Sequence, residues 1–350
     1  MTARSAWLFS PSVDLTVFLG SAFASLALLW IGAQTGVLNE HTPDWIWIPA
    51  VLLIDVAHVW GTGFRVYFDR NEFSRRPWLY TLTPIIGFAI GVALYAHGEQ
   101  IFWRVLAYLA VFHFIRQQYG WVALYRARAG ERDRFGFWID ACAIYLATIY
   151  PLIYWHAHLP RQFSWFLDND FAGLPGSSQF EQILQPVYWL ALATYVVRSA
   201  YRWLIKNEIN PGKDIVVITT AVCWYTGIIA FNSDYAFTVT NVIIHGVPYF
   251  ALVYWYMRSQ GTGRSPISFL ATLWMIAFIE EMLWDRGVWH DRAWFFGSGW
   301  DLNSLRIVIV PLLAVPQWTH YVLDGFIWKR RSNPNFVLVN STGVLGTDSN

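Results

Sequence analysis

The sequence of 350 residues contains little charge. Asp, Glu, Lys and Arg make up 13% of it, about half the share that is usual in soluble domains. Lys and Arg number 24 and Asp and Glu 23, so there is no basic excess of the kind that binds nucleic acid. Apolar residues make up 56%, which leaves too few polar residues to coat a soluble enzyme. We therefore expect a polytopic membrane protein that binds no nucleic acid.

Cysteine and the common catalytic motifs are scarce as well. Only Cys142 and Cys223 are present, both inside apolar runs, so neither a disulfide framework nor a cysteine zinc motif is predicted. The sequence has no glycine-rich phosphate loop and no Gly-x-Ser-x-Gly nucleophile motif. Tryptophan is abundant, with 22 residues, which is typical of interfacial aromatic belts and also of an aromatic substrate cavity.

Ten apolar stretches are long enough to span a bilayer, since a spanning helix needs about 20 mostly apolar residues. They predict an all-α helical bundle that forms one transmembrane domain over residues 1–331. The segment 332–350 is rich in Asn, Ser, Thr and Gly and is predicted to be a flexible tail. The predicted spans are 13–33, 45–68, 78–97, 100–125, 135–159, 183–205, 214–232, 235–257, 266–285 and 303–328.

The basic residues predict how this bundle is oriented. Eighteen of the 24 Lys and Arg fall on one side of the ten spans, and only Arg161, Arg286 and Arg292 fall in the loops of the other side. Because cytoplasmic loops carry the excess of Lys and Arg, the richer side is expected to be cytoplasmic. With an even number of spans, both termini are expected on that side.

Four histidines are predicted to lie deep in the membrane, each on a different span. With a rise of 1.5 Å per residue, His58, His113, His245 and His320 lie about 12–18 Å from the cytoplasmic ends of their helices. All four helices run in the same direction, so the histidines share one slab about 6 Å thick. Ionisable groups inside a membrane are costly and usually functional. This common depth favours a metal or haem site, with a proton path or polar packing as the alternatives.

Polar residues at helical spacing accompany these histidines and are candidates for orienting them. A ligating histidine usually gives its other ring nitrogen a hydrogen-bonding partner, and Asp55, Gln117, Asn241 and Asp324 are placed to serve. In the second span, Asp55, His58, Thr62, Arg65 and Asp69 form one polar stripe. Interhelical hydrogen bonding is the alternative interpretation of these residues. Glu280 and Glu281 have two interpretations. One of them is a metal ligand or a proton carrier, or at least one of them lies at the membrane interface.

The donor type limits which metal could bind. Imidazole ligands suit iron, copper and zinc. A zinc hydrolase would need a water path and a carboxylate base, and neither is evident in the sequence. An iron site with open positions would activate dioxygen, and its depth in the bilayer implies an apolar substrate that arrives from the lipid.

Four segments resemble the Brp/Blh family of membrane β-carotene 15,15′-dioxygenases. They are Asp55-Val-Ala-His58, Phe112-His113-Phe114, Ile244-His245 with Tyr249, and the run from Val315 to Asp324 that contains His320. The resemblance covers under a third of the chain. It implies a helical membrane enzyme that uses non-haem iron (Fe2+) and dioxygen on a carotenoid-like or other apolar lipid or isoprenoid substrate.

Residue by residue, the resemblance implies that His58, His113 and His245 hold the iron. Tyr249 falls where the family has a second histidine of a pair, and Gln317 falls where it has a Val-Pro-His histidine. These are two departures from the family pattern. His320 lies one helical turn beyond Gln317, and we infer that it supplies the missing imidazole. Tyr249, Arg116, Gln117 and Asp55 are expected to support catalysis around the metal.

Two other functions remain open from the sequence. The stripe from Asp55 to Asp69 would also suit a membrane transporter, although no internal repeat is visible. A haem or quinone redox protein could use two of the four histidines as axial ligands. In each case we expect a multi-pass protein of a bacterial inner (plasma) membrane.

Overall fold

Every element of regular structure in the described chain is a helix. The computed structural model describes residues 7–261 and 264–329. The all-α prediction is confirmed for this part of the chain. The predicted tail, 332–350, lies outside the described residues.

Eight helical segments are long and apolar enough to cross a membrane. Five of them combine α-helical and π-helical turns. The first three segments are α1 (Pro11–Asp14) with η1 (Leu15–Gly20) and α2 (Ser21–Thr35); α3 (Asp44–Ile46) with η2 (Trp47–Val56), α4 (Ala57–Val59) and η3 (Gly63–Tyr67); and α6 (Pro77–His97). The other five are α8 (Arg134–Ala157); α10 (Pro211–Trp224) with η5 (Tyr225–Ala230); α11 (Asp234–Phe237) with η6 (Thr238–Val242) and α12 (Ile243–Ser259); α13 (Pro266–Trp284) with η7 (Asp285–Trp289); and η8 (Asn303–Leu305) with α15 (Arg306–Leu313) and α16 (Val315–Ile327).

Two further long helices occupy the remaining predicted spans. They are α7 (Glu99–Ala129) and α9 (Ser177–Tyr201), the latter continued by η4 (Arg202–Lys206). Neither is among the eight segments apolar enough to span by composition. In α7 the polar side chains of its central turns lower the hydropathy, and these are the turns that carry His113. Two short helices, α5 (Arg70–Arg75) and α14 (Ala293–Phe296), lie between spans.

Local sequence signals set many of the helix ends. Ser10 precedes Pro11 and accepts a hydrogen bond from the backbone N–H of Val13, an N-cap followed by proline at the first helical position. Ser233 and Ser265 cap α11 and α13 in the same way. At the other end, α2 and α7 each end at a glycine in the left-handed conformation, as is common where a helix stops.

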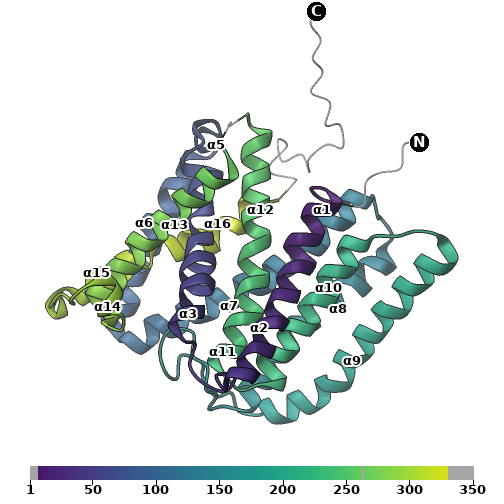
Figure 1. The fold of residues 1–350 in the computed structure, drawn as a ribbon, viewed down its shortest axis with the longest axis horizontal. Coiled ribbons are helices and arrows are strands. Elements are labelled where there is room, and N and C mark those ends of the chain that lie inside the picture. The colour runs from purple at the N-terminus through teal and green to yellow at the C-terminus, as the bar shows by residue number, and fades with distance from the viewer. Residues whose placement is uncertain (1–6, 262–263, 330–350) are drawn as a thin grey trace, which may run out of the picture.

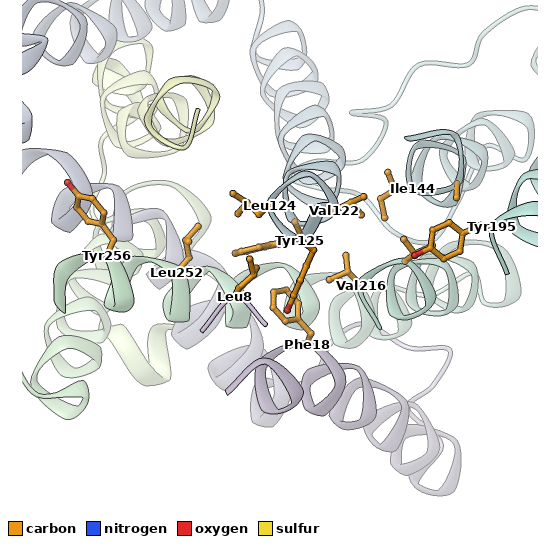
Figure 2. Close-up of a cluster of buried hydrophobic side chains, with 13 residues drawn as sticks. Leu8, Phe18, Val122, Leu124, Tyr125, Ile144, Tyr195, Val216, Leu252 and Tyr256 are labelled. Atoms are coloured by element: carbon orange, nitrogen blue, oxygen red, sulfur yellow. The ribbon is translucent and has the colours of Figure 1, made fainter. Parts of the chain in front are cut away.

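The helices pack side by side, as Figure 1 shows. The α11–α12 segment runs through the middle beside η2 and α4, α9 lies at one edge against α8, and α6 and α15 lie at the other. Figure 2 shows one of the cores, where Phe18 of η1 meets Tyr125 of α7 with ring centroids 5.7 Å apart. The Tyr125 hydroxyl donates to buried Asp14 at 2.9 Å, so this core also satisfies a buried carboxylate.

Charged side chains join α7, α8 and α10 at one end of the bundle. Lys213 is 1% exposed and lies 2.7 Å from Glu131 and 3.0 Å from Asp140. Arg126 pairs with the same two carboxylates. Because buried charges are tolerated only when paired, this cluster fixes the helices to one another.

The outer faces of several helices are apolar. On α9, Ile183 is 68% exposed and Leu190 67% exposed. On α6, Ile85 is 56% exposed. Large apolar faces of this kind are unsuited to water and suited to lipid. Together with the eight apolar spans, they identify an integral membrane protein.

Candidate metal centre

The four predicted deep histidines meet at one point in the fold. His58 comes from α4, His113 from α7, His245 from α12 and His320 from α16. Each is at most 4% exposed. Each offers one ring nitrogen, and the four nitrogens all lie within 4.8 Å of one another. The structure therefore brings together side chains that are up to 262 positions apart in the sequence.

The rings face one another in two close pairs. His58 and His245 have their Nε2 atoms 3.0 Å apart, and His113 and His320 have theirs 3.1 Å apart. At a metal–nitrogen distance of about 2.1 Å, ligands at right angles are about 3.0 Å apart and opposite ligands about 4.2 Å. The spacing of the four nitrogens is therefore close to that of four ligands around a single ion.

Hydrogen bonds orient two of the rings so that their Nε2 atoms point to the centre. His58 Nδ1 contacts the backbone carbonyl of Asp55, which can only accept, so Nδ1 carries the proton and Nε2 a lone pair. His320 Nδ1 lies 2.8 Å from the Thr62 hydroxyl, and this contact fixes the ring with Nε2 toward the centre. Two lone pairs at 3 Å repel, so each close pair needs a shared proton or a shared cation between its rings.

A carboxylate lies beside the other pair. Asp324 has one oxygen 3.9 Å from His113 Nε2 and the other 3.9 Å from His320 Nδ1. It accepts hydrogen bonds from the Tyr249 hydroxyl at 2.7 Å and from the Trp328 indole at 3.2 Å. The carboxylate is thus held in place by Tyr249 and Trp328, with its negative charge close to both rings.

Packing holds His245 in place from two sides. Its ring stacks on Phe114 with centroids 3.5 Å apart, and its backbone carbonyl accepts a hydrogen bond from Gln117 at 2.7 Å. His245 Nδ1 is buried without a partner among the described residues. Next to it, Gly246 lets α12 approach η2 closely, since a Cβ there would lie 2.5 Å from Ile54 Cγ2.

The predicted catalytic residues fall in different places. Tyr249 lies against two of the histidines, with ring centroids 5.7 Å from His58 and 5.2 Å from His320. Asp55 lies beside His58, its carboxylate 3.7 Å from Nδ1. Gln117 contacts the His245 backbone rather than its ring.

Arg116 and Asn241 turn away from the four rings. Arg116 is exposed and its guanidinium contacts the Tyr145 hydroxyl and the Tyr119 ring. The Asn241 amide donates to Thr240 of its own helix at 3.0 Å. Asn241 precedes His245 by four residues, but the π-helical turn at Thr238–Val242 is wider than an α-turn and shifts the register of side chains along the helix.

The polar stripe of the second span divides into two parts. Its first half, from Asp55 to Thr62, reaches the histidines. In its second half, Arg65 is fully buried, pairs with Glu72 at 3.0 Å and donates to the Ile327 backbone carbonyl at 2.9 Å. This second half therefore joins η3 to α5 and α16.

Several site residues were not predicted in their roles. The sequence places Thr62 on the polar stripe, but its hydrogen bond to His320 depends on how each of the two helices is rotated about its own axis. Glu280 is 5% exposed and accepts from Trp60 at 2.5 Å and Gln317 at 2.6 Å, so it is held inside the bundle. Tyr321 packs on His113 with ring centroids 5.1 Å apart. The helical spacing of Gln317, Tyr321 and Asp324 on one face was the only available signal.

Two cavities reach the histidines from different sides. One, of about 560 Å³, has polar and aromatic walls, extends from His41 and Asp291 in the loops between spans, and includes His58 and Asp55. The other, of about 750 Å³, has mainly apolar walls from α7, α8, α12 and α16, and includes His113 and Tyr249. Tyr321 lines both cavities. The centre is thus open to a polar and an apolar approach.

Comparisons with protein-family models, with curated proteins and with solved structures find no match to this chain.

Proposed function

We propose that this chain is a membrane oxygenase that uses non-haem iron (Fe2+) and dioxygen on an apolar lipid, carotenoid-like or other isoprenoid substrate. The observation that carries the proposal is the convergence of four buried imidazoles beside an apolar cavity of about 750 Å³. His58, His113, His245 and His320 would hold the metal. The Brp/Blh resemblance proposes the same first three residues.

The donor set suits an iron ion better than a haem. A haem takes its two axial imidazoles on opposite faces of a flat macrocycle, whereas here all four rings converge on one point. Imidazole nitrogens suit iron, copper and zinc, and the mainly apolar walls of the 750 Å³ cavity favour iron, because they suit an apolar substrate for oxygenation. When bound, an iron ion with open positions supplies activation of dioxygen.

The protein's own residues would orient the ligands and balance the charge of the metal. Thr62 and the Asp55 carbonyl would hold the His320 and His58 rings with Nε2 toward the metal. Asp324, held by Tyr249 and 3.9 Å from His113 Nε2, would balance the positive charge of the ion. Phe114 would pack on the face of the His245 ring and Tyr321 against the His113 ring, which fixes both rings.

The apolar cavity supports a substrate that arrives through the membrane. Its walls include Phe112, Ile149 and Leu252, with the ligand His113 among them. A substrate in this cavity would reach the metal without passing through water, as an isoprenoid or carotenoid chain requires.

We further propose the full membrane topology. α7 and α9 would also span, which gives ten spans and places both termini in the cytoplasm. The burial of α7 inside the bundle supports this, because a central helix can carry polar residues that lipid would not tolerate. The excess of Lys and Arg on one side supports the orientation, and a bacterial inner membrane is the proposed location.

Metal analysis together with a visible spectrum tests the proposal. We would measure detergent-purified wild type, His113→Ala, and the control His97→Ala, an exposed histidine whose ring bonds a backbone carbonyl of its own helix. About one iron per chain is expected in wild type and control, lost in His113→Ala and without a Soret band. A Soret band, or no bound metal in freshly purified wild type, would overturn it. Oxygen uptake with a carotenoid or isoprenoid then tests the reaction.

A further inference from the structure

One arginine at the middle of a membrane helix is not explained by the metal site. Arg116 is the eighteenth of the 31 residues of α7 and is exposed. It contacts the Tyr145 hydroxyl and lies 5.2 Å from the Tyr119 ring centroid. Among the residues that the structure describes, no carboxylate lies within salt-bridge distance of it. A guanidinium at this depth is costly unless an anion pairs with it.

Arg116 lies at the wall of the apolar cavity that reaches the metal centre. The same cavity is lined by His113, one helical turn away on α7. Around Arg116 the walls are aromatic, with Tyr119 and Tyr145 stacked at 4.8 Å. Elsewhere they are mostly aliphatic or aromatic, for example at Leu252. The other charged residues of the lining are Asp324, which Tyr249 and Trp328 already hold, and Lys329, just after the end of α16. Arg116 is the cation one helical turn from His113, beside mainly apolar walls, and so matches an apolar chain that carries one negative charge.

We infer that this cavity binds a single-chain lipid with a carboxylate end, and that Arg116 pairs with the carboxylate. The inference rests on the proposed function, because it names the substrate class of the same site. The planar guanidinium presents two parallel N–H donors to a carboxylate, and the Tyr145 hydroxyl can add a third. The chain then lies along the apolar wall and passes His113.

The depth of Arg116 selects a free acid over other anionic lipids. Phospholipid headgroups stay in the interfacial region of a bilayer, far from the middle of a helix this long. A phosphate carries more charge than a carboxylate and is more costly to desolvate. A carboxylic acid can enter the bilayer in its neutral form and ionise beside the guanidinium.

Fluorescence of a polyene fatty acid tests this inference directly. cis-Parinaric acid accepts energy from tryptophan, and Trp121 and Trp328 line the cavity. Its methyl ester has the same chain without the charge. Because a hydrogen bond to a charged group contributes about 1.5–3 kcal/mol, the acid is expected to bind wild type at least about tenfold more tightly than the ester.

Substitutions of Arg116 distinguish the effect of losing its charge from the effect of disturbing the fold. Arg116→Gln is expected to weaken binding of the acid about tenfold or more and to leave the ester within about twofold, whereas Arg116→Lys retains part of the preference. Arg134→Gln is the control, since it removes the same charge from an exposed position outside the cavity. Equal binding of acid and ester by wild type overturns the inference, as does the absence of any binding or an equal loss of both ligands in Arg116→Gln.

Metal content measured on the same samples keeps the two proposals apart. Protein that lacks metal but still prefers the acid through Arg116 would contradict the proposed oxygenase and leave the carboxylate site standing. Protein that holds iron but does not distinguish acid from ester would contradict the carboxylate site alone.

Discussion

His58 and His245 hold their Nε2 atoms 3.0 Å apart, although 187 residues separate them in the sequence. The contact depends on the close approach of η2 and α12 at Gly246, where the backbone of Ile54 lies against the helix. His113 and His320 complete the cluster from two other helices. Four interior helices are thus tied to one point, so changes at that point should be felt in the stability of the whole bundle.

Metal removal should lower the thermal stability of wild type. A ligand that binds only the folded state at 100 times its dissociation constant adds about 2.7 kcal/mol to the free energy of unfolding. Treatment with a chelator should therefore lower Tm, and Fe2+ should restore it. His113→Ala should show no response to either treatment, while His97→Ala responds as wild type does. A chelator response in His113→Ala equal to that of wild type would show that the metal binds elsewhere.

Asp324→Asn should weaken metal binding without unfolding the protein. The amide keeps the size of the side chain and an acceptor for Tyr249, but removes the negative charge 3.9 Å from His113 and His320. Loss of such a partner typically lowers metal affinity about 10- to 100-fold. Competition with a metal-sensitive dye measures the change. Tyr249→Phe is the comparison, because it removes one donor to the carboxylate and keeps the charge, so its effect should be smaller.

Gly246→Ala should separate two helices of the site, and Gly120→Ala should not. A Cβ at Gly246 would lie 2.5 Å from Ile54 Cγ2 and 3.3 Å from its carbonyl oxygen, whereas one at Gly120 meets no atom within 4 Å. Overpacking of this kind typically costs about 1–3 kcal/mol, while alanine for glycine in an open helical position gains up to about 1 kcal/mol. Denaturation in detergent and metal content measure both effects.

The two glycine variants should therefore change the stability of the protein in opposite directions. Gly246→Ala should lose stability and iron together, because His58 and His245 move apart with their helices. Gly120→Ala should keep its iron and unfold at the same or a higher temperature. Full iron content in a destabilised Gly246→Ala would mean that the metal does not depend on the approach of η2 and α12.

The apolar helices, and the placement of one histidine on each of four of them, could be predicted from sequence because both follow from hydropathy and spacing along the chain. The rotation of each helix about its axis could not. The bond between Thr62 and His320 and the burial of Glu280 depend on that rotation. At Asn241 the predicted row of side chains was disrupted by a π-helical turn, which hydrophobic periodicity does not reveal.

Burial of charge was also hard to predict from the stripe of the second span. Arg65 follows the helical spacing of a lining residue, but the chain that continues through α5 brings Glu72 back to it. The ion pair between them is visible only once the loop is folded. The first half of the stripe therefore contacts the histidines, whereas Arg65 in its second half serves to join helices.

Low pH should destabilise the bundle through Glu131, in the turn between α7 and α8. Burial raises the pKa of this carboxyl, but Lys213, Asn210 and Arg202 together hold it below its ordinary value of 4.5. A carboxyl whose pKa is lower in the folded state stabilises the protein above its unfolded pKa and loses that contribution as pH falls through the folded value. This group should therefore change Tm little between pH 7 and pH 5, and Tm should decrease once the pH is lowered past 4.5.

Glu131→Gln isolates this contribution. The glutamine cannot pair with buried Lys213, and removing one partner of a buried ion pair typically costs about 3–5 kcal/mol. Tm of the variant should be lower than that of wild type at pH 7, and the difference should shrink as pH falls below 4.5, where wild type loses the same charge. Glu208→Gln is the control, because that carboxylate is 61% exposed and its pair with Arg202 is screened by water. A difference between Glu131→Gln and wild type that stays constant with pH would show that the loss arises from packing rather than from charge.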